Sequence, residues 1–376
     1  MSGIYIHVPF CLSKCVYCGF YSVAQTRDKE MFVRTLLQEL DLRADYIDLR
    51  AARTLYFGGG TPSLLSLEEL ETIFQHLGQH CRLKNLEEIT LEANPEQLTP
   101  DYCRGLRSLG ISRLSIGVQS FDDDVLRFMG RRHTARQAIE AVENASAAGF
   151  RNLSIDLIFG VAERTDAQWE EDLRTALSLP IQHLSCYALT AEENSRLYKQ
   201  IQQGRHAPVD DEQAERQYKL LHKCLAPTKF QQYEVSNYSL PGFESRHNSA
   251  YWDHTPYLGL GPAAHSFDGA SRQWNAANLK QYGENVAHGI TCEGREELSP
   301  ADLYNETLLL ALRTREGLDL EALHAQYGNE RAQGILNHFR ERVPAGQYEN
   351  AAGKLRLTTE GLWFADGIAE DLFIVD

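Results

Sequence analysis

The chain has 376 residues, of which 43% are hydrophobic and 24% charged, so it can bury a substantial core as a globular protein. Its net charge of −15 disfavours nucleic acid as the main ligand, because no basic stripe is available to contact phosphates. The sequence contains no basic, apolar leader and no apolar run of about 18 residues, so we expect a cytoplasmic protein without an integral membrane segment.

Short β-rich runs alternate with amphipathic helical stretches from residue 4 to about residue 190. The expected strands are 4–8, 54–57, 89–93, 113–118, 152–158 and 183–189. Between them, Ser66 and Thr134 begin helices with capping boxes. Repeated βα units build a parallel sheet, and six units fall short of the eight that close a barrel. We therefore predict an α/β fold with a partial, open (β/α)6 TIM-like barrel.

The chain after these units divides into two further parts. Residues 233–267 are rich in aromatic residues, Gly, Pro and His, which is typical of an irregular functional loop region. From about residue 298, two or three helices precede a β-rich run at 354–357, which resembles a winged-helix unit. We predict a barrel at 1–230, a loop region that closes it at 231–297, and a mainly helical, winged-helix-like domain at 298–376. The acidic composition favours docking over DNA binding for this last domain.

Three of the eight cysteines lie close together, directly after the first expected strand. Cys11, Cys15 and Cys18 have a spacing that a short loop can wrap around one face of a metal cluster, whereas the other five are scattered. Iron–sulfur cubanes usually take four thiolates, so three leave one iron open to an exogenous ligand. S-adenosylmethionine suits this position through its amine and carboxylate. The alternatives are a zinc knuckle without its fourth ligand, and ordinary buried cysteines.

Other distinctive residues also follow expected strands, at the edge where parallel barrels hold their functional groups. Gly58, Gly59 and Gly60 follow the second strand, where the absence of side chains lets the backbone approach a ligand. Glu92 lies at the end of the third strand and can accept hydrogen bonds from an ammonium group or a ribose hydroxyl. A simple tight turn is the alternative for the glycines.

Five motifs together resemble those of the radical S-adenosylmethionine superfamily. They are YIHVPFC at 5–11, FGGGTPS at 57–63, LEANP at 91–95, SIGVQSF at 115–121 and DLIFG at 156–160. Over nearly its whole length the chain is similar to the group that contains HemW heme chaperones and oxygen-independent coproporphyrinogen III oxidases. The resemblance implies a 4Fe-4S cluster on Cys11, Cys15 and Cys18. It also implies S-adenosylmethionine contacts for Tyr5, Tyr17, Gly59, Gly60, Thr61, Glu92, Gln119, Arg131, Asp156 and Ala188.

Two features differ from the oxidases of this group. The oxidases carry a further cysteine two residues after the third cluster ligand, where this chain has Phe20, and a long N-terminal extension, whereas ten residues precede Cys11 here. Residues 246–252, RHNSAYW, match instead the HNxxYW pattern of HemW, with an imidazole beside large aromatic side chains. Imidazole is a normal axial ligand of heme iron, and aromatic rings can pack on the macrocycle.

We therefore predict that His247 and Tyr251 bind heme, with His247 as a ligand of the heme iron. On spacing alone, a hydrogen-bonded structural role for His247 is an equal alternative. His254 and His265 are alternative ligands, for which a loop-stabilising hydrogen bond is the simpler role.

The sequence favours a heme chaperone that transfers heme to an acceptor protein and carries a 4Fe-4S cluster with exchangeable S-adenosylmethionine. It leaves open an oxidase that decarboxylates coproporphyrinogen III by radical chemistry, and a radical enzyme that acts on heme itself. Whether the protein is an enzyme therefore stays open, and no catalytic residue is assigned. The expected partners are heme, an acceptor protein and an electron donor, and dimerisation through the cluster domain is left open.

Overall fold

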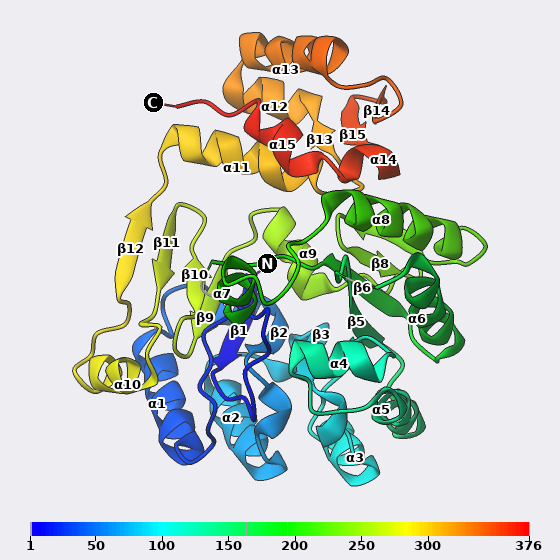
Figure 1. Cartoon of the computed structure of the whole chain (residues 1–376). Helices are drawn as coiled ribbons and strands as arrows, with labels where there is room; N and C mark the ends of the chain where they lie inside the picture. The colour runs from blue at the N-terminus through cyan, green and yellow to red at the C-terminus, as the bar shows by residue number, and fades with distance from the viewer. Residues whose placement is uncertain (1, 163, 194, 376) are drawn as a thin grey trace.

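The computed structural model describes residues 2–162, 164–193 and 195–375 (Figure 1). Its main feature is a mixed sheet of 12 strands in the order β12-β11-β10-β9-β1-β2-β3-β4-β5-β6-β8-β7. A separate sheet of three strands lies in the C-terminal part of the chain. Among the described residues, no helix is long and apolar enough to cross a membrane.

Six parallel strands, β1 to β6, form the centre of the large sheet. They span Ser2–Val8, Ala52–Gly59, Glu88–Ala93, Arg113–Gln119, Leu153–Phe159 and His183–Ala188, so each lies within two residues of its predicted ends. The helices that follow β1 to β5 along the chain are α1 (Lys29–Leu42), α2 (Leu67–His80), α3 (Pro100–Ser108), α4 (Asp123–Met129), α5 (Ala135–Ala147) and α6 (Asp166–Ser178). Figure 1 shows these helices on the outside of the sheet, which confirms the predicted partial (β/α)6 barrel.

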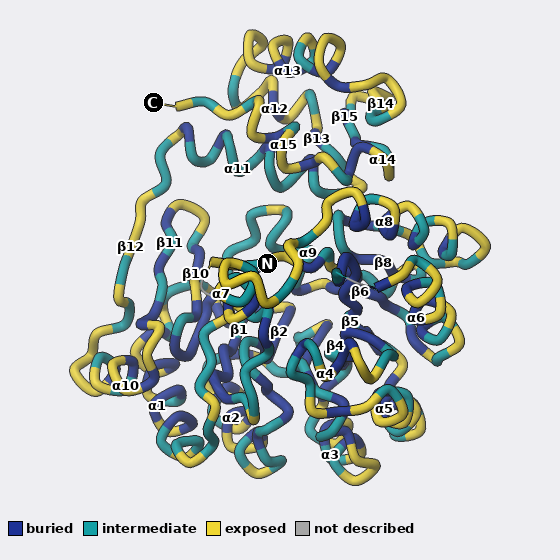
Figure 2. Tube along the Cα trace, viewed as in Figure 1, coloured by how far each residue is buried: buried dark blue, intermediate teal, exposed yellow. Residues whose placement is uncertain are grey.

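Local sequence explains where these elements begin and which side they bury. Ser66 and Thr134 cap the amino ends of α2 and α5, and both capping boxes form as predicted. Strands β1 to β6 are buried along most of their length, as expected for parallel strands with helices on one side and the barrel interior on the other (Figure 2). Ile4, Ile6 and Val8 of β1 have no exposed surface.

The region that we expected to be an irregular loop contains regular structure, so this part of the prediction was wrong. It follows α7 (Arg196–Gln202) and α8 (Asp211–Leu225) and holds β7 (Gln231–Glu234), β8 (Asn237–Ser239), α9 (Arg246–Trp252), β9 (Tyr257–Leu260), β10 (His265–Phe267), β11 (Ser271–Trp274), α10 (Leu279–Ala287) and β12 (Gly294–Glu297). Strand β9 pairs with β1 and β8 pairs with β6, so both edges of the barrel sheet are extended. These strands have three or four residues each, too few to show an alternating apolar pattern.

The C-terminal part has a hydrophobic core of its own, with Leu308, Phe339 and Leu355 at its centre. It comprises α11 (Pro300–Leu312), β13 (Leu318–Asp319), α12 (Leu320–Tyr327), α13 (Asn329–Arg342), β14 (Tyr348–Ala351), β15 (Lys354–Leu357), α14 (Thr359–Leu362) and α15 (Ala365–Glu370). The mainly helical content with a small antiparallel sheet agrees with the predicted fold of this part.

A buried network attaches the added strands to α1. The carboxylate of Glu39 accepts hydrogen bonds from the hydroxyl of Tyr282 at 2.7 Å, the amide of Asn275 at 2.6 Å and the backbone N–H of Gly261 at 2.8 Å. Arg43, one turn later, pairs with Glu39 at 3.4 Å. Burial raises the pKa of Glu39, and the contact with Arg43 opposes this rise.

We expect Glu39→Ala to destabilise the protein by about 3–5 kcal/mol, because it leaves the buried charge of Arg43 without its partner. Urea unfolding followed by circular dichroism measures this loss. The matched control is Glu30→Ala on the exposed side of the same helix, which should change the free energy of unfolding by less than about 0.5 kcal/mol. Similar stabilities of the two variants would show that the network does not hold the added strands.

Candidate functional site

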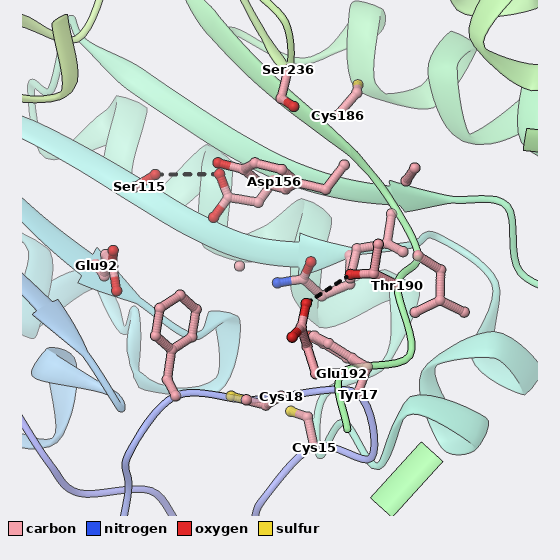
Figure 3. A pocket seen from close by; sticks show the side chains of 18 of the residues that line it. Cys15, Tyr17, Cys18, Glu92, Ser115, Asp156, Cys186, Thr190, Glu192 and Ser236 are labelled. Carbon is pink, nitrogen blue, oxygen red and sulfur yellow. Dashed lines mark hydrogen bonds between the residues drawn. The ribbon is translucent and has the colours of Figure 1, made fainter. Parts of the chain in front are cut away.

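A cavity of about 940 Å³ lies at the carboxyl ends of the barrel strands. Figure 3 shows it from close by, with Cys15, Cys18, Glu92 and Asp156 among the side chains around it. Of the predicted site residues, its wall contains Cys11, Cys15, Tyr17, Cys18, Gly59, Gly60, Thr61, Glu92, Gln119, Arg131, Asp156 and Ala188. Tyr5, His247 and Tyr251 lie elsewhere. The fold therefore brings together residues that are up to 177 positions apart in sequence, from Cys11 to Ala188.

The cysteine loop, residues 11–23, follows β1 and is attached to the barrel at several points. The N–H of Cys11 donates to the carbonyl of Val23 at 3.0 Å, which closes the loop at its base. The N–H of Val16 donates to the carbonyl of Met129 at the end of α4, at 3.1 Å. Beneath the loop, the buried ring of His7 contacts the carbonyl of Tyr21 at 3.0 Å. The backbone therefore holds the loop in place without help from the thiol groups.

The three thiols suit a cluster better than a single metal ion. All three are free and partly exposed to the cavity. Bonds of about 2.3 Å to one zinc ion would hold the sulfurs within about 4.6 Å of one another. In the described part of the chain, these three sulfurs do not all lie within 4.8 Å of one another. The three thiols are therefore not arranged around a single ion, and three thiolates on one loop suit an iron–sulfur cluster with one open iron.

Two neighbouring side chains donate hydrogen bonds to the sulfurs. The hydroxyl of Thr61 lies 3.6 Å from the Sγ of Cys11, and Nη1 of Arg131 lies 3.5 Å from the Sγ of Cys15. Both donors can therefore hydrogen-bond to sulfur atoms that ligate a metal.

The glycine turn at the end of β2 fits against the end of β1 and against Phe10, with no space for side chains. A Cβ atom on Gly60 would lie 2.6 Å from the carbonyl oxygen of Phe10. Gly59 has a φ of 103°, and a Cβ atom there would lie 2.6 Å from the ring of His7. Only glycine satisfies both positions. The bare backbone of this turn faces the cavity next to the cysteines.

Two carboxylates face the cavity from β3 and β5. Desolvation in the cavity wall raises the pKa of Glu92 to about 7, although a hydrogen bond from the hydroxyl of Tyr56 at 2.7 Å opposes the rise. Desolvation also raises the pKa of Asp156, against a hydrogen bond from Ser115 at 3.3 Å (Figure 3). A cationic ligand would favour the ionised form of both groups.

The C-terminal part also contributes to the cavity wall, which the sequence did not indicate. Arg313, Trp363 and Asp366 line it, and Arg313 forms an ion pair with Asp366. The guanidinium of Arg313 also lies 5.5 Å from the centre of the Trp252 ring on α9. No motif signals these residues, because they reach the cavity only through the packing of α11 and α15 against the barrel.

His247 lies near the amino ends of β1 to β3, away from the cavity. It is 2% exposed. Its Nδ1 contacts the hydroxyl of Thr54 at 2.8 Å, and its Nε2 contacts the hydroxyl of Tyr251 at 2.9 Å. The carboxylate of Glu88 accepts hydrogen bonds from the backbone N–H groups of Arg246 and His247, each at 3.0 Å, and so anchors the start of α9.

Stacked rings connect His247 with the cavity through the barrel interior. The centre of its ring lies 5.0 Å from that of Tyr56, at an angle of 27°. Tyr56 also stacks on Tyr5 and, through its hydroxyl, contacts Glu92 in the cavity wall. The structure thus places Tyr5 in this stack below the cavity. The sequence did not single out Tyr56. An aromatic residue within a barrel strand could nevertheless have indicated a ring inside the barrel.

The two alternative histidines are separate from this stack. His265 is exposed on β10 and stacks on Trp274, with ring centres 6.0 Å apart. His254 lies beside Phe267, with ring centres 6.1 Å apart.

Comparison with known proteins identifies the family and the fold of the chain. A model of the radical SAM superfamily matches residues 5–176, and a model of the HemN C-terminal domain matches residues 298–364. The solved structure of coproporphyrinogen III oxidase (HemN) from Escherichia coli superposes with a TM-score of 0.85 at 21% identity, covering 99% of this chain and 90% of that chain, and so shares its fold. Residues 5–176 therefore form a domain of the radical SAM superfamily, and membership of this superfamily implies a 4Fe-4S cluster and S-adenosylmethionine.

Two relatives define the family more closely. A heme chaperone HemW from Mycobacterium tuberculosis (strain ATCC 25618 / H37Rv) is 36% identical over 375 residues, which cover 98% of this chain and 94% of that protein. A heme chaperone HemW from Bacillus subtilis (strain 168) is 32% identical over 96% of each chain. Since both matches extend over almost the whole length, the chain belongs to the HemW family.

Proposed function

We propose that this protein is a heme chaperone, which binds heme and transfers it to an acceptor protein. The observation that carries the proposal is the match over nearly the whole chain to proteins named heme chaperone HemW. The cavity supports it. Phe20, 68% exposed, lines the cavity at the position where the oxidases have their further cysteine. Transfer to an acceptor protein, reduction by an electron donor and formation of a homodimer stay predictions.

In the cavity, we propose that Cys11, Cys15 and Cys18 hold the 4Fe-4S cluster and that S-adenosylmethionine binds beside it. When bound, the cluster supplies an electron that can cleave a carbon–sulfur bond of this cofactor. The proposed contacts are Tyr17, Gly59, Gly60, Thr61, Glu92, Gln119, Arg131, Asp156 and Ala188. Tyr5, which the sequence also indicated, does not line the cavity but stacks on Tyr56 below it. The bare backbone at Gly59 and Gly60 can approach the polar end of the cofactor. Glu92 can accept hydrogen bonds from its ammonium group or ribose.

For heme, we propose that His247 is a ligand of the iron and that Tyr251 belongs to the same site. Burial lowers the pKa of His247 to about 3, so its imidazole is neutral near pH 7 and has a lone pair for a metal. Thr54 is buried whereas Tyr251 is partly exposed, so Nε2 is the nitrogen nearer the surface. Ligation at Nε2 requires the Tyr251 hydroxyl to move away. The contacts from His247 through Tyr56 to Glu92 give a physical route by which the two sites can influence each other.

One experiment separates this function from the oxidase activity. The cluster is reconstituted without oxygen, and heme titration is then compared with coproporphyrinogen III turnover on the same sample. We expect a Soret band that saturates with heme, and no release of carbon dioxide from coproporphyrinogen III in the presence of a reductant and S-adenosylmethionine. Turnover of coproporphyrinogen III would overturn the proposal.

Binding of S-adenosylmethionine should depend on pH through Glu92. The carboxyl has a pKa of about 7, so it is mostly protonated at lower pH and ionised at higher pH. Because a sulfonium cofactor prefers the ionised form, its affinity should rise about tenfold between about pH 6 and about pH 8. Calorimetric titration of cluster-loaded protein measures this rise. Glu92→Gln should remove most of the rise, whereas Glu140→Gln, on the exposed side of α5, should keep it.

The raised pKa of Glu92 also predicts how the stability of the unliganded protein changes with pH. A carboxyl with a raised pKa in the folded state gives up its proton more easily when unfolded, so the free energy of unfolding should fall as pH rises from about 4.5 to about 7. Glu92→Gln should flatten this part of the stability profile. If the affinity of the wild-type protein for S-adenosylmethionine did not change with pH, the proposed contact between Glu92 and this cofactor would be wrong.

A further inference from the structure

A cluster of two histidines and one aspartate lies on the outer surface of the barrel, outside the sites described above. His76 and His80 are one turn apart on α2, and Asp41 is in the last turn of the neighbouring α1. The Nε2 atoms of both histidines lie 2.8 Å from the same oxygen, Oδ1 of Asp41. In the described part of the chain, this is the one group of three His, Cys, Asp or Glu side chains whose ligand atoms all lie within 4.8 Å of one another.

We propose that Asp41, His76 and His80 bind a divalent transition metal ion, with zinc as the expected ion. Two imidazole nitrogens and one carboxylate oxygen, completed by water, form a common zinc donor set. Bonds of about 2.0–2.2 Å in tetrahedral geometry place the ligand atoms about 3.3 Å apart. Each nitrogen–oxygen distance therefore has to open by only about half an ångström to admit the ion.

The two helices hold these ligands in position before any ion enters. Helices α1 and α2 lie side by side (Figure 1), and an ion pair between Lys29 and Glu69, at 3.0 Å, joins their first turns. Positions four residues apart face the same side of a helix, so both imidazoles reach Asp41 together. Their ring centres are 5.5 Å apart. Binding therefore requires little movement of the helices, and each imidazole carries its proton on Nδ1 when Nε2 ligates the ion.

The site is also open to solvent. The Asp41 side chain is 54% exposed and each histidine side chain is 19% exposed, so an ion can enter and retain a water ligand. Figure 2 shows exposed and intermediate residues along the outer side of α2. Cys81, the next residue along the chain, packs in the main core at 5% exposure and belongs to that core rather than to the site.

The position of Asp41, His76 and His80 in the fold indicates what the zinc ion does. Helix α2 leads from the end of β2 to the start of β3, so its last turn lies at the edge of the barrel opposite the cysteine loop. An ion bound there links α1 to α2 and cannot reach the cavity. We infer that zinc stabilises this wall of the barrel.

Calorimetric titration with Zn²⁺ tests the site in a full-length background in which Cys11, Cys15 and Cys18 are replaced with Ala, so that their thiolates do not take up zinc. We expect one tightly bound ion per chain. His76→Ala and His80→Ala should each weaken binding more than about tenfold, because even outer-shell partners of a metal contribute that much. His288→Ala, an exposed histidine after α10, is the matched control and should bind as the background does.

A second measurement uses the cluster-loaded wild-type protein. Added Zn²⁺ should raise its Tm, and a chelator should reverse the rise, since a ligand that binds only the folded state stabilises it. His76→Ala should abolish the rise. Asp41→Asn keeps the shape of the side chain but loses its charge, so it should fold normally and bind Zn²⁺ more weakly. Tight binding that survives in Asp41→Asn and both histidine variants, or no binding to the background, would overturn the proposal.

Discussion

Replacing Cys11, Cys15 and Cys18 together with Ala should abolish the uptake of iron and sulfide while the barrel stays folded. The three thiols are the proposed ligands, and Cys186, which also lines the cavity, has a pKa that burial raises well above its usual value. The fold should survive because backbone hydrogen bonds at Cys11 and Val16 hold the cysteine loop. The measurement is iron and sulfide per chain after reconstitution without oxygen, with circular dichroism to verify folding.

Two further cysteines provide matched controls for this variant. Cys224 and Cys292 are partly exposed but lie outside the loop, so Cys224→Ala and Cys292→Ala should take up the cluster as the wild type does. S-adenosylmethionine binding should disappear with the cluster in the triple variant and persist in the controls. Iron and sulfide retained by the triple variant, or zinc taken up by the wild type in their place, would contradict the cluster assignment.

Local sequence was sufficient to predict the barrel, and the resemblance to a known family indicated most of the residues that line the cavity. Strands β1 to β6 are short runs rich in apolar residues, and the capping boxes at Ser66 and Thr134 depend on residues only three positions apart. The cysteine spacing and the glycine turn are similarly local, and the parallel arrangement then brings the carboxyl ends of the strands together. Residues such as Glu92 and Asp156 therefore meet although 64 positions separate them in the chain.

Features that depend on packing between distant segments were not predictable in the same way. The sequence placed His247 in a loop region that closes the barrel, but the carboxylate of Glu88 fixes α9 near the amino ends of the strands. This contact joins residues 159 positions apart and has no sequence pattern. The same reason applies to Arg313 and Asp366, which reach the cavity from the C-terminal part.

Replacing His247 with Ala should weaken heme binding by about 100-fold or more, which corresponds to about 2.7 kcal/mol. The reason is the loss of the proposed iron ligand, and the readout is the Soret band during heme titration. The substitution also removes two buried hydrogen bonds, so a loss of about 2–4 kcal/mol in the free energy of unfolding is expected as well. A control therefore has to separate the loss of a ligand from the loss of stability.

His183→Ala is that control, because the ring of His183 has nearly the same surroundings as the ring of His247. It is fully buried, its Nδ1 contacts the hydroxyl of Ser154 at 2.7 Å, and its Nε2 contacts the hydroxyl of Tyr233 at 2.8 Å. His183→Ala should therefore destabilise the fold as much as His247→Ala does, yet bind heme like the wild type. Equal heme binding by the two variants would mean that His247 has only a structural role.

Tyr251→Phe distinguishes which group ligates the iron. If Nε2 of His247 is the ligand, its hydrogen bond with the Tyr251 hydroxyl, 2.9 Å long, has to break before heme binds. Removing that hydroxyl then avoids the cost of one buried hydrogen bond, about 0.5–1.5 kcal/mol, so heme should bind about two- to tenfold more tightly. If the phenol oxygen of Tyr251 is itself the ligand, the same variant should bind heme more weakly. Opposite shifts in His247→Ala and Tyr251→Phe therefore assign the iron to the imidazole.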